Sequence, residues 1–348
     1  DRFSRYMENH NGWFSETHPS SRALTIAYFS AEYGLHHSLP FYAGGLGFLA
    51  GDHLKECSDL GVPLVGVGFM YSQGYLHQRI LPDGWQDNIR EFLDREAAPV
   101  RRVTDSTGGQ LVLEVPGITP PIKVAVWRVD VGKVPLYLLD TDIPENTPQA
   151  RAISSRLYTG DKEQRLVQEI VLGIGGRKVL SELGIDFSAV HLNEGHPSFA
   201  LLERTREFIE DGLSFPDALA RVRGTSVFTT HTPVAAGHDV FPAPLIDKYF
   251  SGYYPSLGID RDTFLDLGRN PGDPAGVFNM AAFALKFTAY HNAVSRNHGI
   301  VSRRMWNHLW PDLALEKVPI DVITNGVHLP TWMNQRMEGL FSKYIGPV

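Results

Sequence analysis

Apolar runs alternate with segments of helical periodicity in the first seventy residues. Residues 23–32 form a nearly uninterrupted apolar run, and residues 63–70 form a second one. Between them, residues 50–60 carry apolar side chains at helical spacing and stop at Gly61. Near-continuous apolar runs are typical of parallel strands that are buried on both faces. The order therefore predicts a strand–helix–strand unit of a doubly wound α/β sheet.

Residues 71–140 have a different character, because short β-rich stretches alternate there with turn sequences such as Pro-Asp-Gly and Thr-Gly-Gly. The β-rich stretches are 76–81, 110–115, 122–131 and 134–140. We expect them to form a β-rich insertion, about residues 71–140, beside the main sheet. The rest of the chain predicts strands at 188–193, 226–232 and 319–324, and helices at 162–183, 197–211, 215–223 and 278–296. The whole pattern predicts one α/β domain, residues 1–348, with a parallel core sheet.

The composition limits the class of protein. Of the 348 residues, 43% are hydrophobic and 20% are charged, and the formal net charge of −7 is spread along the chain. No basic run suggests nucleic-acid binding, and no apolar run approaches the roughly 20 residues that span a bilayer. The single cysteine, Cys57, fits a reducing compartment. We expect a cytoplasmic globular protein and, because the chain starts at Asp1 rather than at methionine, a fragment or a processed chain.

Polar residues follow several of the predicted strands. Glu32 ends the first strand, Asn193, Glu194 and His196 follow a later one, and His231 lies at the end of the next. Because the carboxyl ends of parallel strands meet at one edge of a sheet, where open α/β proteins bind ligands, these side chains are expected to converge. Each cluster alone is also explained as a cap of the following helix. Together they favour a binding site.

A glycine-rich stretch lies between the first strand and the first helix, with Gly44, Gly45, Gly47 and Gly51. Glycine lets the backbone approach a ligand closely, and the first turn of a helix presents free N–H groups and the positive end of the helix dipole. We predict a site here for an anionic or hydroxyl-rich ligand. The glycine spacing matches neither a Walker loop nor a dinucleotide-binding fingerprint, and the histidines have no metal-binding spacing.

Nine segments taken together are more specific than any one of them. In chain order they are Tyr28-Phe29-Ser30-Ala31-Glu32-Tyr33-Gly34, Gly44-Gly45-Leu46-Gly47, Leu49-Ala50-Gly51-Asp52-His53-Leu54-Lys55, Leu139-Asp140-Thr141-Asp142, Arg165-Leu166-x-Gln168-Glu169, His191-Leu192-Asn193-Glu194-Gly195-His196, Phe228-Thr229-Thr230-His231-Thr232-Pro233, Ala236-Gly237-His238-Asp239 and Ile323-Thr324-Asn325-Gly326-Val327-His328. In this combination the chain closely resembles the amino-terminal half of an α-glucan (glycogen, starch or maltodextrin) phosphorylase of the short bacterial type. The resemblance covers nearly the whole chain.

The resemblance implies a GT-B architecture, in which two Rossmann-like domains face a cleft. It implies transfer of a terminal α-1,4-linked glucosyl unit to phosphate with retention, giving glucose 1-phosphate. The implied cofactor is pyridoxal 5′-phosphate, held mainly by a lysine of a carboxyl-terminal domain that this chain lacks, so the chain alone is expected to be inactive. The implied partners are an α-1,4-glucan or maltodextrin, inorganic phosphate, the carboxyl-terminal half of the enzyme and, in a homodimer, a second copy.

The same resemblance assigns roles to residues. His231 and Asn325 match catalytic contacts to the transferring glucose, and Gly45 and Trp332 match positions beside the cofactor. Gly44, Gly45 and Leu46 match the family's glycine loop, which faces the phosphate and the sugar. Together with Gly47 and the strand-end residues Glu32, Asn193, Glu194 and His196, they are the predicted substrate-binding residues.

Two alternatives stay open. The sequence departs from the family pattern at Val240, Ala293, Asn297 and Ile300, which fits a non-catalytic glucan-binding or regulatory relic of the family. The other alternative is a GT-B glycan synthase that uses a nucleotide-sugar donor. Such enzymes place a lysine two or three residues before Gly-Gly-Leu, whereas residues 41–43 here are Phe-Tyr-Ala.

Overall fold

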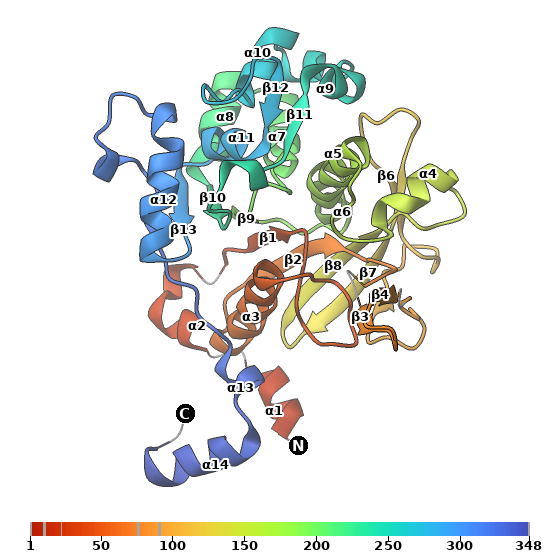
Figure 1. Ribbon diagram of the computed structural model, residues 1–348, viewed down its shortest axis with the longest axis vertical. Helices are drawn as coiled ribbons and strands as arrows, with labels where there is room; N and C mark the ends of the chain where they lie inside the picture. Colours follow the sequence, from red (N-terminus) through yellow and green to blue (C-terminus); the bar gives the residue numbers. More distant parts are fainter. Residues whose placement is uncertain (1, 10–11, 22, 75–76, 90–91, 347–348) are drawn as a thin grey trace.

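The computed structural model describes residues 2–9, 12–21, 23–74, 77–89 and 92–346. Its main feature is a mostly parallel sheet surrounded by helices (Figure 1). The strands follow one another across the sheet in the order β14 (Asp321–Val322), β13 (Tyr290–Ala293), β10 (Ser226–Thr230), β9 (Ala189–Asn193), β1 (Ile26–Ser30), β2 (Leu64–Phe69), β8 (Val134–Asp140), β7 (Lys123–Val131) and β5 (Arg101–Arg102), with β6 (Val112–Glu114) paired to β7. The prediction of an α/β fold with a parallel core is confirmed.

Strand β1 lies inside this order, and the chain extends the sheet from it in two directions. β1 pairs in parallel with β2 on one side and with β9 on the other. The sheet continues from β2 to β8, whereas the later strands β10, β13 and β14 extend the side of β9. The crevice between the carboxyl ends of β1 and β9 is therefore a topological switch point, which is where open α/β sheets bind ligands.

The two central strands are buried as their sequences predict. All residues of β2 are buried, and so are those of β1 after Ile26. Strands covered on both faces have no solvent-facing positions for polar side chains, which explains the uninterrupted apolar runs. The helix predicted to join these two strands is α3 (Gly45–Leu60).

The long helix predicted at 162–183 is present with one irregular turn. It consists of α5 (Lys162–Ile170), a π-helical turn at Val171–Gly175 and α6 (Gly176–Glu182). The π-helical turn contains Gly173, where an added Cβ would lie 2.6 Å from the backbone nitrogen of Ala200 in α7 (Phe199–Glu210). Glycine therefore allows the two helices to pack closely at this turn.

Two strand predictions need correction. Part of the β-rich region does not lie beside the main sheet, because β8 pairs in parallel with β2 and β7 pairs with β8. Within the described part of this region, β3 (His77–Ile80) and β4 (Gln86–Ile89) form a hairpin separate from the main sheet, and residue 76 of the expected strand lies outside the described residues. The helix predicted at 278–296 is interrupted by β13, which pairs with β10. Pairing with an already formed sheet edge overrides the local helical pattern.

The remaining elements complete the covering of the sheet. The other helices are α1 (Arg2–Glu8), α2 (Trp13–Thr17), α4 (Pro148–Arg151), α8 (Phe215–Gly224), α9 (Ala243–Phe250), α10 (Arg261–Leu267), α11 (Met280–Phe287), α12 (Arg296–Trp306), α13 (Leu329–Trp332) and α14 (Gln335–Tyr344), and a two-stranded sheet is made of β11 (Val240–Pro242) and β12 (Val277–Asn279). In Figure 1, α14 projects from the body of the fold. None of the helices in the described ranges has the length and apolar character needed to cross a membrane.

Candidate functional site

Glu32 follows β1, and both oxygens of its carboxylate are engaged. Oε2 accepts hydrogen bonds from the N–H groups of Ala43 (2.7 Å) and Gly44 (3.2 Å), and Oε1 accepts one from the Tyr158 hydroxyl (2.6 Å). Glu32 is 2% exposed, and a buried carboxylate requires such donors. Glu32 therefore ties the glycine stretch to the loop that carries Tyr158.

The four glycines of the stretch are of two kinds. An added Cβ would lie 2.6 Å from the Glu32 Oε2 atom at Gly47, and 2.1 Å from the carbonyl oxygen of Gly34 at Gly51. These two positions need glycine for close packing. At residues 44–45, in contrast, an added Cβ would meet no atom within 4 Å. The space in front of these two glycines is open.

Helix α3 begins at this open space. The Gly44 N–H donates to Glu32, no side chain caps the helix, and the N–H groups of residues 47–48 reach back to the Gly44 carbonyl at 3.1 and 3.2 Å. The N–H groups of residues 45–46 have no acceptor within the described ranges. Free N–H groups and the positive end of the helix dipole together favour an anion at this position.

Glu194, directly after β9, locks the end of β10 in place. Its φ of 68° is uncommon for a residue with a side chain. Its Oε2 atom accepts hydrogen bonds from the N–H of His231 (2.8 Å), the N–H of Thr232 (3.0 Å) and the Thr232 hydroxyl (3.0 Å). Burial by itself would raise the pKa of Glu194, but the nearby histidines, with His238 first, and the donated backbone N–H hold it below its usual value.

A buried ionic cluster connects α5 to the loop before β11. Arg165 donates to Oδ2 of Asp239 from Nε (3.2 Å) and Nη2 (2.9 Å). Burial by itself would raise the pKa of Asp239, but Arg165 and His196 hold it at about 2. Burial and the adjacent Asp239 raise the pKa of Glu169 well above its usual range, and burial beside Arg165 lowers the pKa of His196 to about 4. At neutral pH, Asp239 is therefore ionised and His196 is uncharged, and Glu169 loses its proton less readily than a free carboxyl group.

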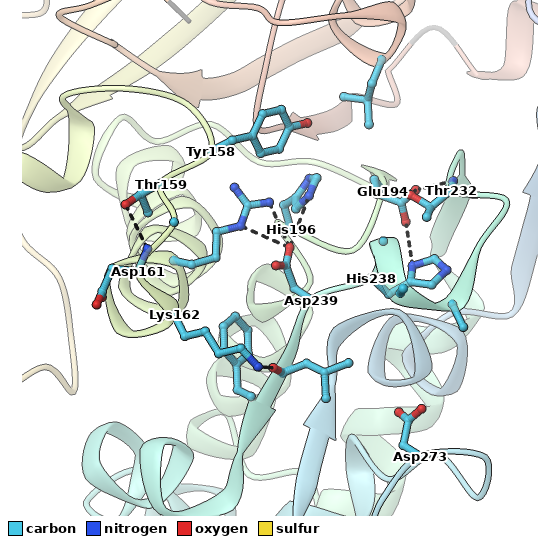
Figure 2. A pocket seen from close by; sticks show the side chains of 18 of the residues that line it. Tyr158, Thr159, Asp161, Lys162, Glu194, His196, Thr232, His238, Asp239 and Asp273 are labelled. Atoms are coloured by element: carbon cyan, nitrogen blue, oxygen red, sulfur yellow. Dashed lines mark hydrogen bonds and ion pairs between the residues drawn. The ribbon is translucent and has the colours of Figure 1, made fainter.

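These groups border a cavity of about 750 Å³ at the switch point of the sheet (Figure 2). The Tyr158 ring covers one side of the cavity. The guanidinium group of Arg165 lies 4.8 Å from the centroid of this ring. Figure 2 shows His196 and Asp239 pointing toward each other, with His238 on the opposite side of the cavity beside Glu194. Leu46, in the first turn of α3, also lines the cavity. The glycine stretch and the strand ends thus share one site.

Comparison with known proteins was made over the whole chain. The chain is 44% identical over 348 residues to a maltodextrin phosphorylase of Thermococcus litoralis, with 100% of this chain and 41% of the relative covered. It is 45% identical over 344 residues to a glycogen phosphorylase of Aquifex aeolicus (99% and 49% covered) and 44% identical over 340 residues to one of Mycobacterium tuberculosis (92% and 39% covered). The predicted resemblance to α-glucan phosphorylases is confirmed.

This similarity concerns part of the phosphorylase length. The chain spans between 39% and 49% of these phosphorylases. A family model described as a protein of unknown function (DUF3417) matches residues 1–39. That match includes β1 and the Glu32 carboxylate that binds the glycine stretch.

The structure brings most of the sequence-predicted phosphorylase site together. Leu46, Glu194 and His196 line the cavity. Asn193 and His231 are hydrogen-bonded to each other, and His231 directly precedes Thr232, which lines the cavity. Gly44 and Gly45 face open space beside Leu46, whereas Glu32 and Gly47 lie beneath the loop, with Glu32 engaged by backbone N–H groups. Their assignment to substrate binding and catalysis stays a prediction.

Two predicted residues lie elsewhere. Asn325 is exposed in the loop after the edge strand β14 and donates its N–H to the Val294 carbonyl at 3.2 Å. Trp332 lies against α3, since its Nε1 donates to Oδ2 of Asp52 at 2.7 Å and its ring is 5.4 Å from that of Phe48. Trp332 is therefore close to the beginning of α3 but does not line the cavity.

Several cavity residues were not predicted as site residues. They are Tyr158, Arg165, Thr232, His238 and Asp239. Arg165 and Asp239 belong to two of the motifs quoted in the sequence analysis, and an ion pair between these opposite charges could have been predicted from them. Tyr158 lies outside the predicted strands and helices, and its positive φ of 55° has no sequence signature.

Proposed function

We propose that this chain forms one wall of the catalytic cleft of a retaining α-glucan phosphorylase with the GT-B architecture, in which residues 1–348 form the amino-terminal domain. The whole protein would transfer a glucosyl unit from an α-1,4-glucan to inorganic phosphate and release glucose 1-phosphate. Similarity to maltodextrin and glycogen phosphorylases along the whole chain supports this proposal. The position of the cavity at the switch point of the sheet supports it as well.

The contrast between charged and neutral groups around the cavity carries the proposal. The charged side chains are satisfied from within the chain, because Arg165 binds Asp239 and backbone N–H groups bind Glu194. The two histidines that line the cavity, His196 and His238, have pKa values lowered by burial and are neutral at pH 7. A polar lining of neutral groups suits an uncharged polyhydroxylated ligand such as a glucan.

The beginning of α3 would supply the anion-binding part of the same cleft. The N–H groups of residues 45–46 face open space, which fits a phosphate group. Pyridoxal phosphate, when bound, supplies a phosphate group that exchanges a proton with the substrate phosphate. In this chain, Gly45 and Trp332 would lie beside it, with Trp332 held in place by Asp52.

Large exposed apolar side chains near α3 support a protein partner on this side. Trp332 is 53% exposed, and Val327 and Ile323 are each 64% exposed. Apolar side chains exposed in one segment are typical of a contact surface. We propose that the carboxyl-terminal half of the enzyme covers them, which would bring the cofactor opposite the first turn of α3.

The test is to combine this chain with the carboxyl-terminal half and pyridoxal phosphate, add maltoheptaose and inorganic phosphate, and measure glucose 1-phosphate. We expect a product that requires phosphate and the glucan. A complex that binds the cofactor and the glucan but forms no phosphate-dependent product would refute the proposal and favour the non-catalytic relic. Glucan extension from a nucleotide-sugar donor, without phosphate, would favour the synthase.

A further inference from the structure

His231 follows β10 and contacts a buried amide at the end of the neighbouring strand. Its Nε2 lies 2.5 Å from Oδ1 of Asn193, the last residue of β9. The backbone N–H of His231 is held at the same time by Glu194 at 2.8 Å. Asn193 is fully buried. His231 is therefore held at two points, its imidazole by the last residue of β9 and its backbone N–H by the residue that follows β9.

The orientation of the Asn193 amide follows from its other neighbour. The Ser30 hydroxyl donates to the Glu32 carbonyl at 2.8 Å, so its oxygen is left to accept the Asn193 Nδ2 hydrogen at 3.0 Å. Turning the amide round would require the Ser30 hydroxyl to donate to Asn193 instead. The buried Glu32 carbonyl would then lose its donor, which is costly. The Asn193 oxygen consequently faces His231.

An amide oxygen can only accept a hydrogen bond, so Nε2 of His231 carries the hydrogen. Burial lowers the pKa of His231, although Glu194 acts in the opposite direction, so the ring is neutral at pH 7 and its Nδ1 has a free lone pair. Nδ1 has no partner in the described part of the chain and is not among the fully buried polar atoms without one. Solvent or a ligand can therefore reach it.

We propose that Asn193 is a positioning residue that fixes the tautomer of His231, with Nε2–H directed to the protein and Nδ1 left as an acceptor for a hydroxyl group of the glucan. This inference rests on the proposed function for the identity of the ligand. Hydrogen bonds from the Glu32 carbonyl through Ser30 and Asn193 to His231 connect the choice of tautomer to the end of β1.

The tautomer can be measured without enzyme activity. In this chain labelled with ¹⁵N-histidine, two-bond ¹⁵N–¹H correlations at pH 7.5, assigned with His231→Gln, should show His231 protonated at Nε2. A ring protonated at Nδ1 overturns the proposal. Asn193→Leu should remove the preference for Nε2–H, whereas Asn292→Ala, at another buried strand end whose oxygen accepts from Thr229, should leave His231 unchanged.

Activity provides the second measurement, in the reconstituted enzyme. Asn193→Leu should lower kcat/KM by about 10- to 100-fold, in the range found for groups that orient a functional histidine. Asn193→Asp keeps the acceptor but favours the imidazolium ion, so kcat should fall toward acid pH over a range in which the wild type is flat. A decrease in kcat of Asn193→Asp without this pH dependence would overturn the proposal. If the wild type forms no product but His231 is protonated at Nε2, the proposed function fails and the tautomer assignment stands.

Discussion

The substitution Gly45→Ala should stabilise the fold and impair ligand binding. Gly45 is the first residue of α3, and an added Cβ there meets no atom within 4 Å. Alanine is about 1 kcal/mol more favourable than glycine inside a helix, and we take about half of that for the first turn. For a chain of 348 residues, the corresponding increase in Tm is about 0.7 °C. The new methyl group would also occupy the space beside the unpartnered N–H groups of residues 45–46.

The cost to an anion seated there follows from packing. A methyl group forced against a closely fitting neighbour costs about 1–3 kcal/mol, which corresponds to roughly 5- to 150-fold weaker binding. The matched control is Gly51→Ala in the same helix, where the added Cβ would lie 2.1 Å from the Gly34 carbonyl oxygen. Because a backbone atom cannot move aside cheaply, this control should destabilise the fold by at least the same 1–3 kcal/mol.

Two assays separate the effects. Urea unfolding, followed by tryptophan fluorescence, gives the change in stability, and phosphate saturation of the reconstituted enzyme gives the change in function. Gly45→Ala should raise the unfolding midpoint and raise the KM for phosphate, whereas Gly51→Ala should lower the midpoint. If Gly45→Ala unfolds as easily as Gly51→Ala, or binds phosphate as well as the wild type does, the assignment of the open glycines to a ligand is wrong.

Two further predictions concern pH. Burial lowers the pKa of His191 to about 3 and those of His53 and His196 to about 4. In the unfolded chain histidine pKa values are near 6.5, so below that pH the unfolded chain binds more protons than the fold does. The free energy of unfolding should therefore fall from about pH 6.5 toward pH 4, by up to about 4 kcal/mol per pH unit. A urea midpoint that stays constant between pH 7 and pH 5 would contradict this. The pKa of Glu169 is raised in the fold, so its contribution to stability decreases as pH rises above the pKa of glutamate in the unfolded chain, near 4.3. Glu169→Gln should therefore keep or increase the free energy of unfolding at pH 7 and remove this pH dependence. A loss above about 2 kcal/mol in urea unfolding would show that Glu169 is ionised.

The sequence was sufficient to predict which strand ends lie side by side. Parallel strands place their carboxyl ends on one edge, so Glu32, Asn193 and His231 had to lie near one another once β1, β9 and β10 were recognised. The pattern could not predict which of these side chains are already hydrogen-bonded within the protein. Glu32 and Glu194 were predicted to bind substrate, yet backbone N–H groups occupy oxygens of both carboxylates. Such donors come from loops whose conformation has no periodic signal.

The failures of the prediction have a common physical cause, which is competition between local pattern and sheet pairing. Residues 278–296 have helical periodicity throughout, but β13 within them finds an edge at β10 and buries Ala293 there. Tyr158 was missed for a related reason, since its place over the cavity depends on the hydrogen bond to Glu32 far away in the sequence. A pattern read over a short segment of the sequence cannot predict hydrogen bonds between residues that lie so far apart along the chain.

The charge distribution of the cavity also predicts what the other wall must contain. A helix N-terminus contributes the equivalent of about half a positive charge, whereas a phosphate group carries between one and two negative charges near neutral pH. Arg165 cannot supply the difference, because both of its contacts to Asp239 would have to be broken and the buried carboxylate left unpaired. Lys162 also lines the cavity, with its Nζ 3.5 Å from the Val240 carbonyl oxygen, so a phosphate at α3 requires Lys162 or cationic side chains from outside this wall. Calorimetric titration separates the two sources: we expect the isolated chain to bind maltodextrin measurably and inorganic phosphate only weakly, whereas tight phosphate binding that Lys162→Ala abolishes would place the cation in this wall.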